Sequence, residues 1–153
     1  MRRKDKKIED SKIIEAILTQ SQICHIAFLD DEYPYVVPMN YGYKDDALYF
    51  HCATHGKKLD LIKRNNKVGF EIVLFHELIK KEISCDWTTK YRSIMGTGKI
   101  EIITDFDQKR AGLDILMKQH GREINMYEDK AVKRVVILKL LINSLTAKQS
   151  GDW

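Results

Sequence analysis

The chain has 153 residues, the usual size of one domain, and 44% of them are hydrophobic and 31% charged. Its formal net charge of +4 is mild, and its basic residues are scattered beyond a short N-terminal cluster, which argues against nucleic-acid binding. No apolar run approaches the roughly 18 residues of a membrane span, and no apolar segment of a signal peptide follows the basic start. We therefore expect one domain over residues 1–153, located in the cytoplasm, with neither a membrane nor a nucleic-acid partner.

The cysteines agree with that location. Cys24, Cys52 and Cys85 are an odd number of widely spaced residues, and no C-x-x-C pair is present. In a reducing compartment such a set is typical of free or buried thiols and not of a disulfide framework.

The first half of the chain predicts one helix followed by three strands. Asp10 and Ser11 are capping residues ahead of apolar positions that recur at helical spacing, namely Ile13, Ile14, Ile17 and Leu18. Aromatic and β-branched residues then dominate three segments separated by turn residues: 23–29, 33–43 and 47–51. Because proline cannot donate to a sheet ladder, Pro34 and Pro38 place the second segment at an edge, a bulge or a bend.

The second half predicts two helices and three further strands. Residues 57–65 have apolar residues at helical spacing, and Asn65-Asn66 is a plausible helix end. A second helix is expected from Thr104-Asp105 to about His120, with an apolar face made of Phe106, Leu113, Leu116 and Met117. Strands are expected over 68–74, 92–103 and 132–142. Strands outnumber helices and short turns join them, so the chain is expected to be mainly β: a small antiparallel barrel with peripheral helices.

The residues that could take part in binding or catalysis lie in one block, 35–60. No Walker loop, G-x-G-x-x-G, G-x-S-x-G or H-E-x-x-H motif is present, which excludes several common enzyme classes. Within the block, a strand runs through residues 52–56 into the predicted helix, and such a junction presents free backbone N–H groups and the positive end of a helix dipole. A hydroxyl, a glycine and two lysines accompany it, and these are Thr54, Gly56, Lys57 and Lys58. The pattern fits a phosphate cradle; the alternative is two solvated lysines on a surface helix.

Four side chains invite a metal-binding or nucleophilic role, but the sequence supports neither. His51 and His55 are four residues apart, yet they are expected on a strand and in the following loop, so they share no helix face, and no third metal ligand is near in sequence. Cys52 is expected to be a small buried thiol, because no base is evident beside it. His25 lies in an apolar strand and is expected to be a core histidine. We expect no metal site.

The same block resembles a known family. The sequence is similar to the pyridoxamine-5′-phosphate-oxidase-like flavin-binding split barrels and, within them, to the nitroimidazole-resistance flavoproteins. The segments that carry the resemblance are 1–4 (MRRK), 34–43 (PYVVPMNYGY), 48–58 (LYFHCATHGKK), 91–98 (YRSIMGTG) and 146–148 (TAK). The second and third of these are fairly specific as a pair. The resemblance implies an antiparallel FMN-binding split barrel and a homodimer with FMN at the subunit interface.

The resemblance also implies roles for individual residues. The backbone along the isoalloxazine ring would come from Val37, Pro38, Met39 and Asn40. Phe50 and His51 would flank the ring and the ribityl chain. The phosphate would be held by Lys57, with His55 and Lys58 beside it. Tyr91 would reach the flavin of the partner subunit, and Trp87 would cover the ring.

The function implied is that of an FMN-dependent oxidoreductase, resembling a nitroreductase, that passes electrons or a hydride to a small-molecule acceptor such as a nitroaromatic compound. His51 is the candidate catalytic residue, as a proton donor or as a group that orients the substrate. Vitamin-B6 oxidation is not expected, because the arginine-rich substrate set of those oxidases is absent from the last residues. Two alternatives remain open: a non-enzymatic flavin-binding protein, and a haem-binding split barrel with a histidine ligand.

Overall fold

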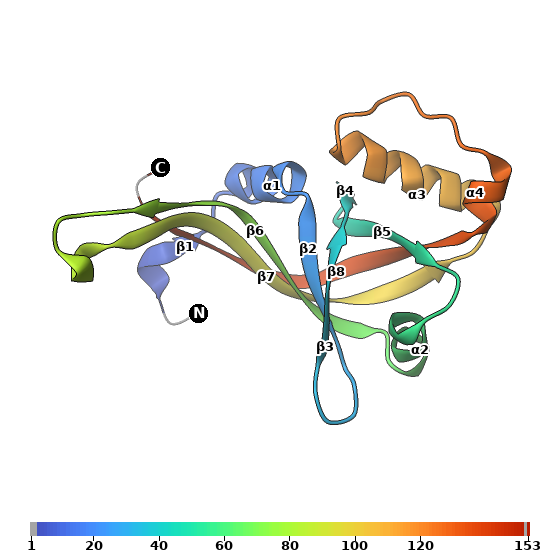
Figure 1. The fold of residues 1–153 in the computed structure, drawn as a ribbon, viewed down its shortest axis with the longest axis horizontal. Coiled ribbons are helices and arrows are strands. Elements are labelled where there is room, and N and C mark those ends of the chain that lie inside the picture. The colour runs from blue at the N-terminus through green and yellow to red at the C-terminus, as the bar shows by residue number, and fades with distance from the viewer. Residues whose placement is uncertain (1–2, 152) are drawn as a thin grey trace.

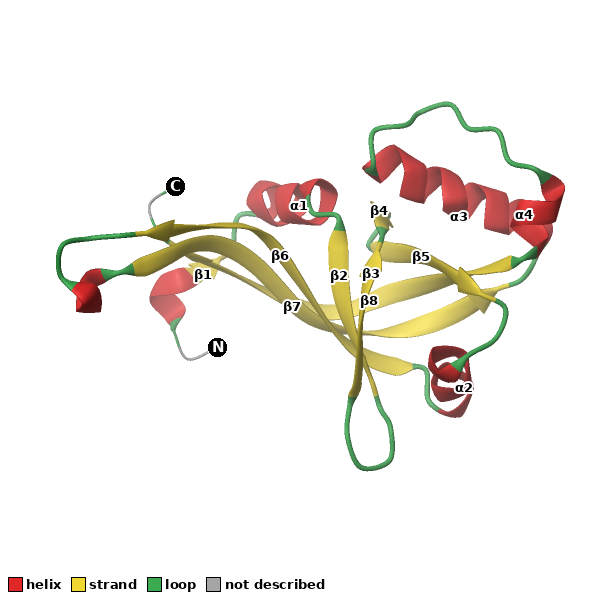
Figure 2. Ribbon diagram, viewed as in Figure 1, coloured by secondary structure: helices red, strands yellow, loops and turns green. Residues whose placement is uncertain are grey.

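The structure, a computed structural model, describes residues 3–151 and 153. Met1 and Arg2, which begin one of the matched segments, lie outside the described residues. One curled antiparallel sheet of eight strands forms the body of the protein, and helices lie around it (Figures 1 and 2). The expected mainly β fold is confirmed, and its curled sheet is consistent with a split barrel. No helix within the described part of the chain is long and apolar enough to cross a membrane.

The strands follow the chain as β1 (Lys7–Ile8), β2 (Ile23–Phe28), β3 (Tyr35–Asn40), β4 (Gly42–Lys44), β5 (Ala47–Ala53), β6 (Lys67–Ile79), β7 (Thr88–Ile103) and β8 (Val135–Ser150). The helices are α1 (Ser11–Gln20), α2 (Lys57–Arg64), α3 (Phe106–Gln119) and α4 (Asp129–Lys133), with 3₁₀ turns at Lys4–Lys6 and Ser84–Asp86. Neighbouring strands in space are β3-β2-β6-β7-β8-β5-β4, and β1 pairs with β8.

One continuous segment supplies both ends of this strand order. β3 pairs with β2, β4 pairs with β5, and Tyr41 alone separates β3 from β4. The Tyr41 ring is fully buried, 6.2 Å between centroids from the Phe50 ring, and its hydroxyl donates to the Leu18 carbonyl at 2.7 Å. Because the chain joins the two edges through a buried residue, the sheet must curl. Pro38 lies in β3, so the expected edge position of this proline is confirmed.

Two helices contribute their apolar faces to the core inside the curled sheet. Asp10 caps α1 by accepting a hydrogen bond from the Lys12 N–H, and α1 buries Ile17 and Leu18. The amphipathic helix α2 buries Leu59, Leu61 and Ile62. Both helices were expected from their spacing, and they pack where the sheet alone would leave apolar side chains in water.

Helix α3 lies closer to the sheet than its sequence indicates. A Cβ on Gly112 would come within 2.8 Å of the Ile137 side chain, and one on Gly42 of β4 within 2.5 Å of the Ile115 carbonyl oxygen. Asp105 caps the helix as expected. The expected apolar face was only partly right: of its four residues Leu116 alone is buried, while Lys109 and Gly112 are buried beside it. The glycines let the backbones approach, and the Lys109 ammonium donates to the Val135 carbonyl at 2.8 Å.

Several strand boundaries were also wrong. β6 and β7 extend beyond the predicted ranges and form a long hairpin arm, residues 75–91, that projects from the barrel (Figure 1). The last strand begins at Val135, because residues 129–133 form α4, and it continues to Ser150 instead of ending near residue 142. The added part of β8, residues 143–150, is mostly polar, and its pairing with β7 holds it in the sheet. The backbone hydrogen bonds of this pairing cannot be predicted from the local sequence.

Candidate functional site

The candidate site begins where β3 and β5 diverge. β4 pairs only with Ala47, Leu48 and Tyr49, so among the described strands residues 50–53 of β5 pair with β8 alone, and β3 pairs with β2 alone. Figure 1 shows the two strands separating on either side of β4, with α2 following β5. Strand edges of this kind present backbone N–H and C=O groups that are free to bind a partner. We call them the open edges of β3 and β5.

The four predicted residues of β3 alternate between the two faces of its open edge. Val37 and Met39 are half-buried and pack against the core, whereas Pro38 and Asn40 are exposed on the outer face. The Asn40 amide donates to the Gln22 carbonyl at 3.4 Å. This segment therefore offers a polar backbone edge between apolar side chains, which suits the rim of a flat heteroaromatic ring.

The adjoining residues of β5 fall on opposite faces. Phe50 has no exposed surface and packs in the core, so only its backbone is free to contact a ligand. His51 points to the outer face and is partly exposed. Partial burial of the ring, and next the charge of Lys58, lower the pKa of His51, so its neutral form is favoured. Cys52 faces the core, as expected, and burial raises the pKa of its thiol.

The turn from β5 into α2 has the geometry of an anion site. Gly56 is the N-terminal cap, with φ at 132°, a conformation that favours glycine, and a Cβ there would meet nothing within 4 Å. Around it, three side chains are exposed and one is half-buried: Thr54, His55 and Lys57 are exposed, and Lys58 is half-buried. Like every helix, α2 leaves the N–H groups of its first turn without an acceptor inside the helix. The residues present therefore fit a phosphate, and the cradle is open to solvent.

Lys57 connects this turn to the β2–β3 side of the barrel. Its ammonium lies 2.7 Å from Asp30 Oδ2 and 4.8 Å from the centroid of the Tyr35 ring. The hydrogen bond from Lys57 is the main cause that lowers the pKa of Asp30. Tyr35 begins β3, so Lys57 ties the start of α2 to the open edge of β3. The sequence placed Lys57 in the cradle but gave no indication of its contact with Asp30.

Trp87 and Tyr91 lie far from these residues in the same subunit. Trp87 lies near the tip of the hairpin arm, and Tyr91 lies in β7 nearer its base. The arm points away from α2 along the long axis of the molecule (Figure 1). Trp87 donates from Nε1 to the Lys81 carbonyl at 2.7 Å and remains 44% exposed. Tyr91 is half-buried, with the Lys148 ammonium 5.5 Å from its ring. The structure thus brings residues 37–40 and 51–58 to one side of the barrel but does not bring Trp87 or Tyr91 to them.

Comparison with known proteins identifies the fold. A profile of the pyridoxamine 5′-phosphate oxidase family matches residues 10–149. The chain belongs to this family. A comparison with curated protein sequences finds no significant match.

Solved structures of three similar proteins share the fold of this chain. A candidate 5-nitroimidazole antibiotic resistance protein from Bacteroides thetaiotaomicron VPI-5482 is 38% identical, with a TM-score of 0.83 over 94% of this chain and 86% of that chain. The flavocytochrome Anf3 from Azotobacter vinelandii is 18% identical, with a TM-score of 0.84 over 99% of this chain and 72% of that one. A FAD and heme binding protein from Mycobacterium smegmatis is 23% identical, with a TM-score of 0.84 over 97% and 75%. The last two likenesses show the shared fold.

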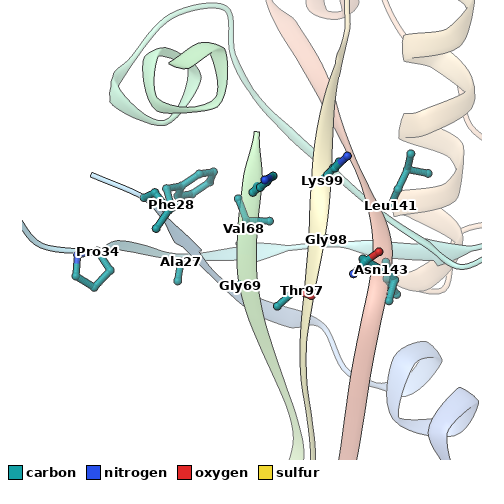
Figure 3. Close-up of a pocket in the computed structure, with 13 residues that line it drawn as sticks. Ala27, Phe28, Pro34, Val68, Gly69, Thr97, Gly98, Lys99, Leu141 and Asn143 are labelled. Carbon is teal, nitrogen blue, oxygen red and sulfur yellow. The ribbon is translucent and has the colours of Figure 1, made fainter. Parts of the chain in front are cut away.

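This oxidase-family chain also has an apolar hollow that the sequence did not indicate. It measures about 670 Å³ and lies over β2, β6, β7 and β8 (Figure 3). Its lining includes three small residues, Ala27, Gly69 and Gly98. Beside it, exposed apolar side chains continue along the outer face of the sheet: Ile23, Val36, Val73 and Met95. The sequence did contain a signal for this apolar face: apolar residues stand at strand positions that point outward, where a solvated face would have polar residues.

His25 belongs to this same outer face of the oxidase-family sheet and not to the core. The side chain is about half exposed, and its Nδ1 lies 3.9 Å from the Glu71 carboxylate on β6. The expectation of a core histidine was wrong because strand alternation turns residue 25 outward, between the buried Cys24 and Ile26. Among the described residues, no group of three or more potential ligands is placed to hold a metal ion.

Proposed function

We propose that this chain is an FMN-dependent oxidoreductase that reduces nitroaromatic compounds. Family membership and 38% identity to a candidate 5-nitroimidazole resistance protein, over nearly the whole chain, support the choice of reaction. The single observation that carries the cofactor assignment is the turn at Gly56 and Lys57. It joins a glycine-capped helix start and a lysine to the open edge of a strand, so that one ligand with a phosphate and a flat ring would contact both.

The proposed placement of FMN uses this chain's residues as follows. The phosphate lies against the first turn of α2, held by Lys57 with Thr54, His55 and Lys58 around it. The ring lies along β3, where Val37, Pro38, Met39 and Asn40 present backbone groups to its polar rim. The backbone at Phe50 and the side chain of His51 face it from β5. When bound, the flavin supplies the redox chemistry, and the protein supplies binding and orientation.

His51 is proposed as the catalytic residue. It is the outward-facing, partly exposed histidine of β5, next to the phosphate turn. Because its pKa is lowered, the ring is neutral near pH 7 and can both donate and accept a hydrogen bond. In that state it orients an acceptor with polar substituents, and it relays a proton: one ring nitrogen takes a proton from solvent while the other gives its own to the reduced group, so that the ring ends neutral.

We propose further that the active form is a cytoplasmic homodimer. Trp87 and Tyr91 belong to the hairpin arm, which points away from α2, and an arm that projects from the barrel in this way would reach a neighbouring subunit. The exposed apolar residues of the outer face supply a surface that a second copy would bury, and a two-stranded hairpin gains stability from such packing. The free thiols of Cys24, Cys52 and Cys85 suit a reducing compartment.

Steady-state kinetics test the proposed reaction. Protein loaded with FMN should oxidise reduced nicotinamide in a manner that depends on an added nitroimidazole, and the product should be the reduced nitro group. Protein that binds FMN but shows no turnover above the rate of free FMN would instead favour a non-enzymatic flavin carrier. Haem binding in place of flavin would favour a haem-binding role like that of the FAD and heme binding protein from Mycobacterium smegmatis.

A further inference from the structure

The Lys57 ammonium already has a carboxylate partner within its own chain. Asp30, in the turn between β2 and β3, lies 2.7 Å from it through Oδ2. The other oxygen of Asp30 accepts from Arg64, at the far end of α2, at 3.3 Å. The Asp30 side chain is 20% exposed and that of Lys57 is 57% exposed. The carboxylate is thus fixed between two cations, and the lysine is the partner with freedom to move.

The surroundings of this pair are acidic. Asp30, Asp31 and Glu32 follow one another in the turn, and with Tyr35 and Lys57 they line a hollow of about 400 Å³. Asp31 is 83% exposed and pairs with Arg64 at 3.2 Å, but it makes no recorded contact with Lys57 among the described residues. Asp30 and Asp31 therefore differ in one respect that matters: Asp30 alone holds the ammonium at the start of α2.

An anion that binds the start of α2 must share Lys57 with Asp30 or displace it. Two like charges that contact one cation repel each other, and the repulsion falls with distance and with solvent screening. Because the Lys57–Asp30 pair is partly exposed, its strength is that of a surface ion pair, and its effect on a competing anion is a modest factor and not an absolute block.

We propose that Asp30 competes with the phosphate group of the flavin for Lys57 and thereby sets how tightly the α2 site retains phosphorylated flavin. The proposal rests on the function proposed above and adds a residue that tunes affinity for phosphate specifically. Asp30 acts against the phosphate through Lys57 and has no part in contacts to the flavin ring. A flavin without phosphate is therefore indifferent to Asp30.

The test compares FMN with riboflavin, which lacks the phosphate, in apo-protein carrying Asp30→Asn or the matched control Asp31→Asn. Asparagine keeps the size and hydrogen-bonding capacity of the side chain and removes its charge. Asp30→Asn should bind FMN about fivefold more tightly than wild type, the scale of an exposed ion pair. Riboflavin affinity should not change, and Asp31→Asn should match wild type for both ligands.

Three results would overturn the proposal: FMN binding by Asp30→Asn that is unchanged, FMN binding that is weaker, or an equal change for riboflavin. Asp30→Ser, which also removes the charge, replaces Asp30→Asn if the latter fails to fold, as judged by thermal melting. In a Lys57→Ala background the substitution of Asp30 should have no effect on FMN affinity, because the group for which both anions compete is gone.

A measurement without flavin separates this proposal from the proposed function. Inorganic phosphate should shift the backbone amide signals of Gly56, Lys57 and Lys58 in NMR spectra, at lower phosphate concentration in Asp30→Asn than in wild type. If phosphate shows this difference but no flavin binds, the proposed function fails and the competition stands. If phosphate affects the two proteins equally or shifts no signal at the start of α2, the competition is refuted.

Discussion

His51 and Ile137 lie directly opposite each other on β5 and β8, on the face of the sheet that α3 covers. Ile137 is completely buried, and a Cβ on Gly112 of α3 would come within 2.8 Å of its side chain. His51 therefore has a fully packed neighbour on one side and solvent on the other. This position explains why the ring is partly desolvated and its pKa lowered although the residue remains accessible to a ligand.

Replacement of His51 by alanine should separate catalysis from cofactor binding. His51→Ala should fold and bind FMN, because the phosphate contacts at α2 remain, while nitroreductase turnover falls by about 100-fold, the usual scale for loss of a positioned proton donor. Steady-state kinetics on FMN-loaded protein measure the effect, and His120→Ala, at the exposed end of α3, serves as the control. Full activity in folded, FMN-loaded His51→Ala would refute the catalytic role.

The lowered pKa of His51 also predicts a pH dependence of stability. In the unfolded chain a histidine has a pKa of about 6.5, and in the folded protein the pKa of His51 is lower. The unfolded state therefore binds more protons in this window, and the free energy of unfolding should fall as pH drops from about 6.5 through the folded-state pKa. Denaturant titrations from pH 8 to 5 should show a smaller loss for His51→Gln than for wild type. Equal losses would show that His51 is not desolvated.

Removal of the Lys57 ammonium should weaken FMN binding. Lys57→Ala removes a charge-assisted contact with the phosphate, worth about 1.5–3 kcal/mol. Titration of apo-protein with FMN measures the loss, and riboflavin affinity should be unaffected. Lys63→Ala is the matched control, since Lys63 lies in the last turn of the same helix and is exposed. If Lys57→Ala binds FMN as tightly as Lys63→Ala does, the phosphate does not lie at the start of α2.

Much of this arrangement could be predicted from the sequence, because its signals are local. Capping residues and apolar spacing placed α1 and α3, and a strand–glycine–lysine junction marked the start of α2. Other features depend on contacts that sequence spacing does not encode. The burial of Phe50 follows from Tyr41, which closes the sheet, and the pairing of Lys57 with Asp30 follows from packing α2 beside the β2–β3 turn. The hairpin arm is polar in sequence and exists through its pairing ladder.

The outer face of the sheet should form the subunit interface. Met95, 50% exposed, lies opposite Glu71 in the β6–β7 ladder, so Met95→Lys introduces a charge that the subunit itself tolerates but that an apolar interface does not. Light scattering should find a dimer for wild type and a larger monomer fraction for Met95→Lys at micromolar concentration. The control is Met126→Lys, at a position 90% exposed in the loop before α4. Flavin-loaded wild type that is entirely monomeric would exclude a site shared between subunits.

The absorption spectrum of the purified protein, followed by titration of apo-protein with FMN, tests the central claim most directly. A flavoprotein should show a band at roughly 450 nm, release FMN on denaturation, and bind one FMN per chain when titrated back. A Soret band with no flavin, or apo-protein that fails to bind FMN at all, would contradict the account.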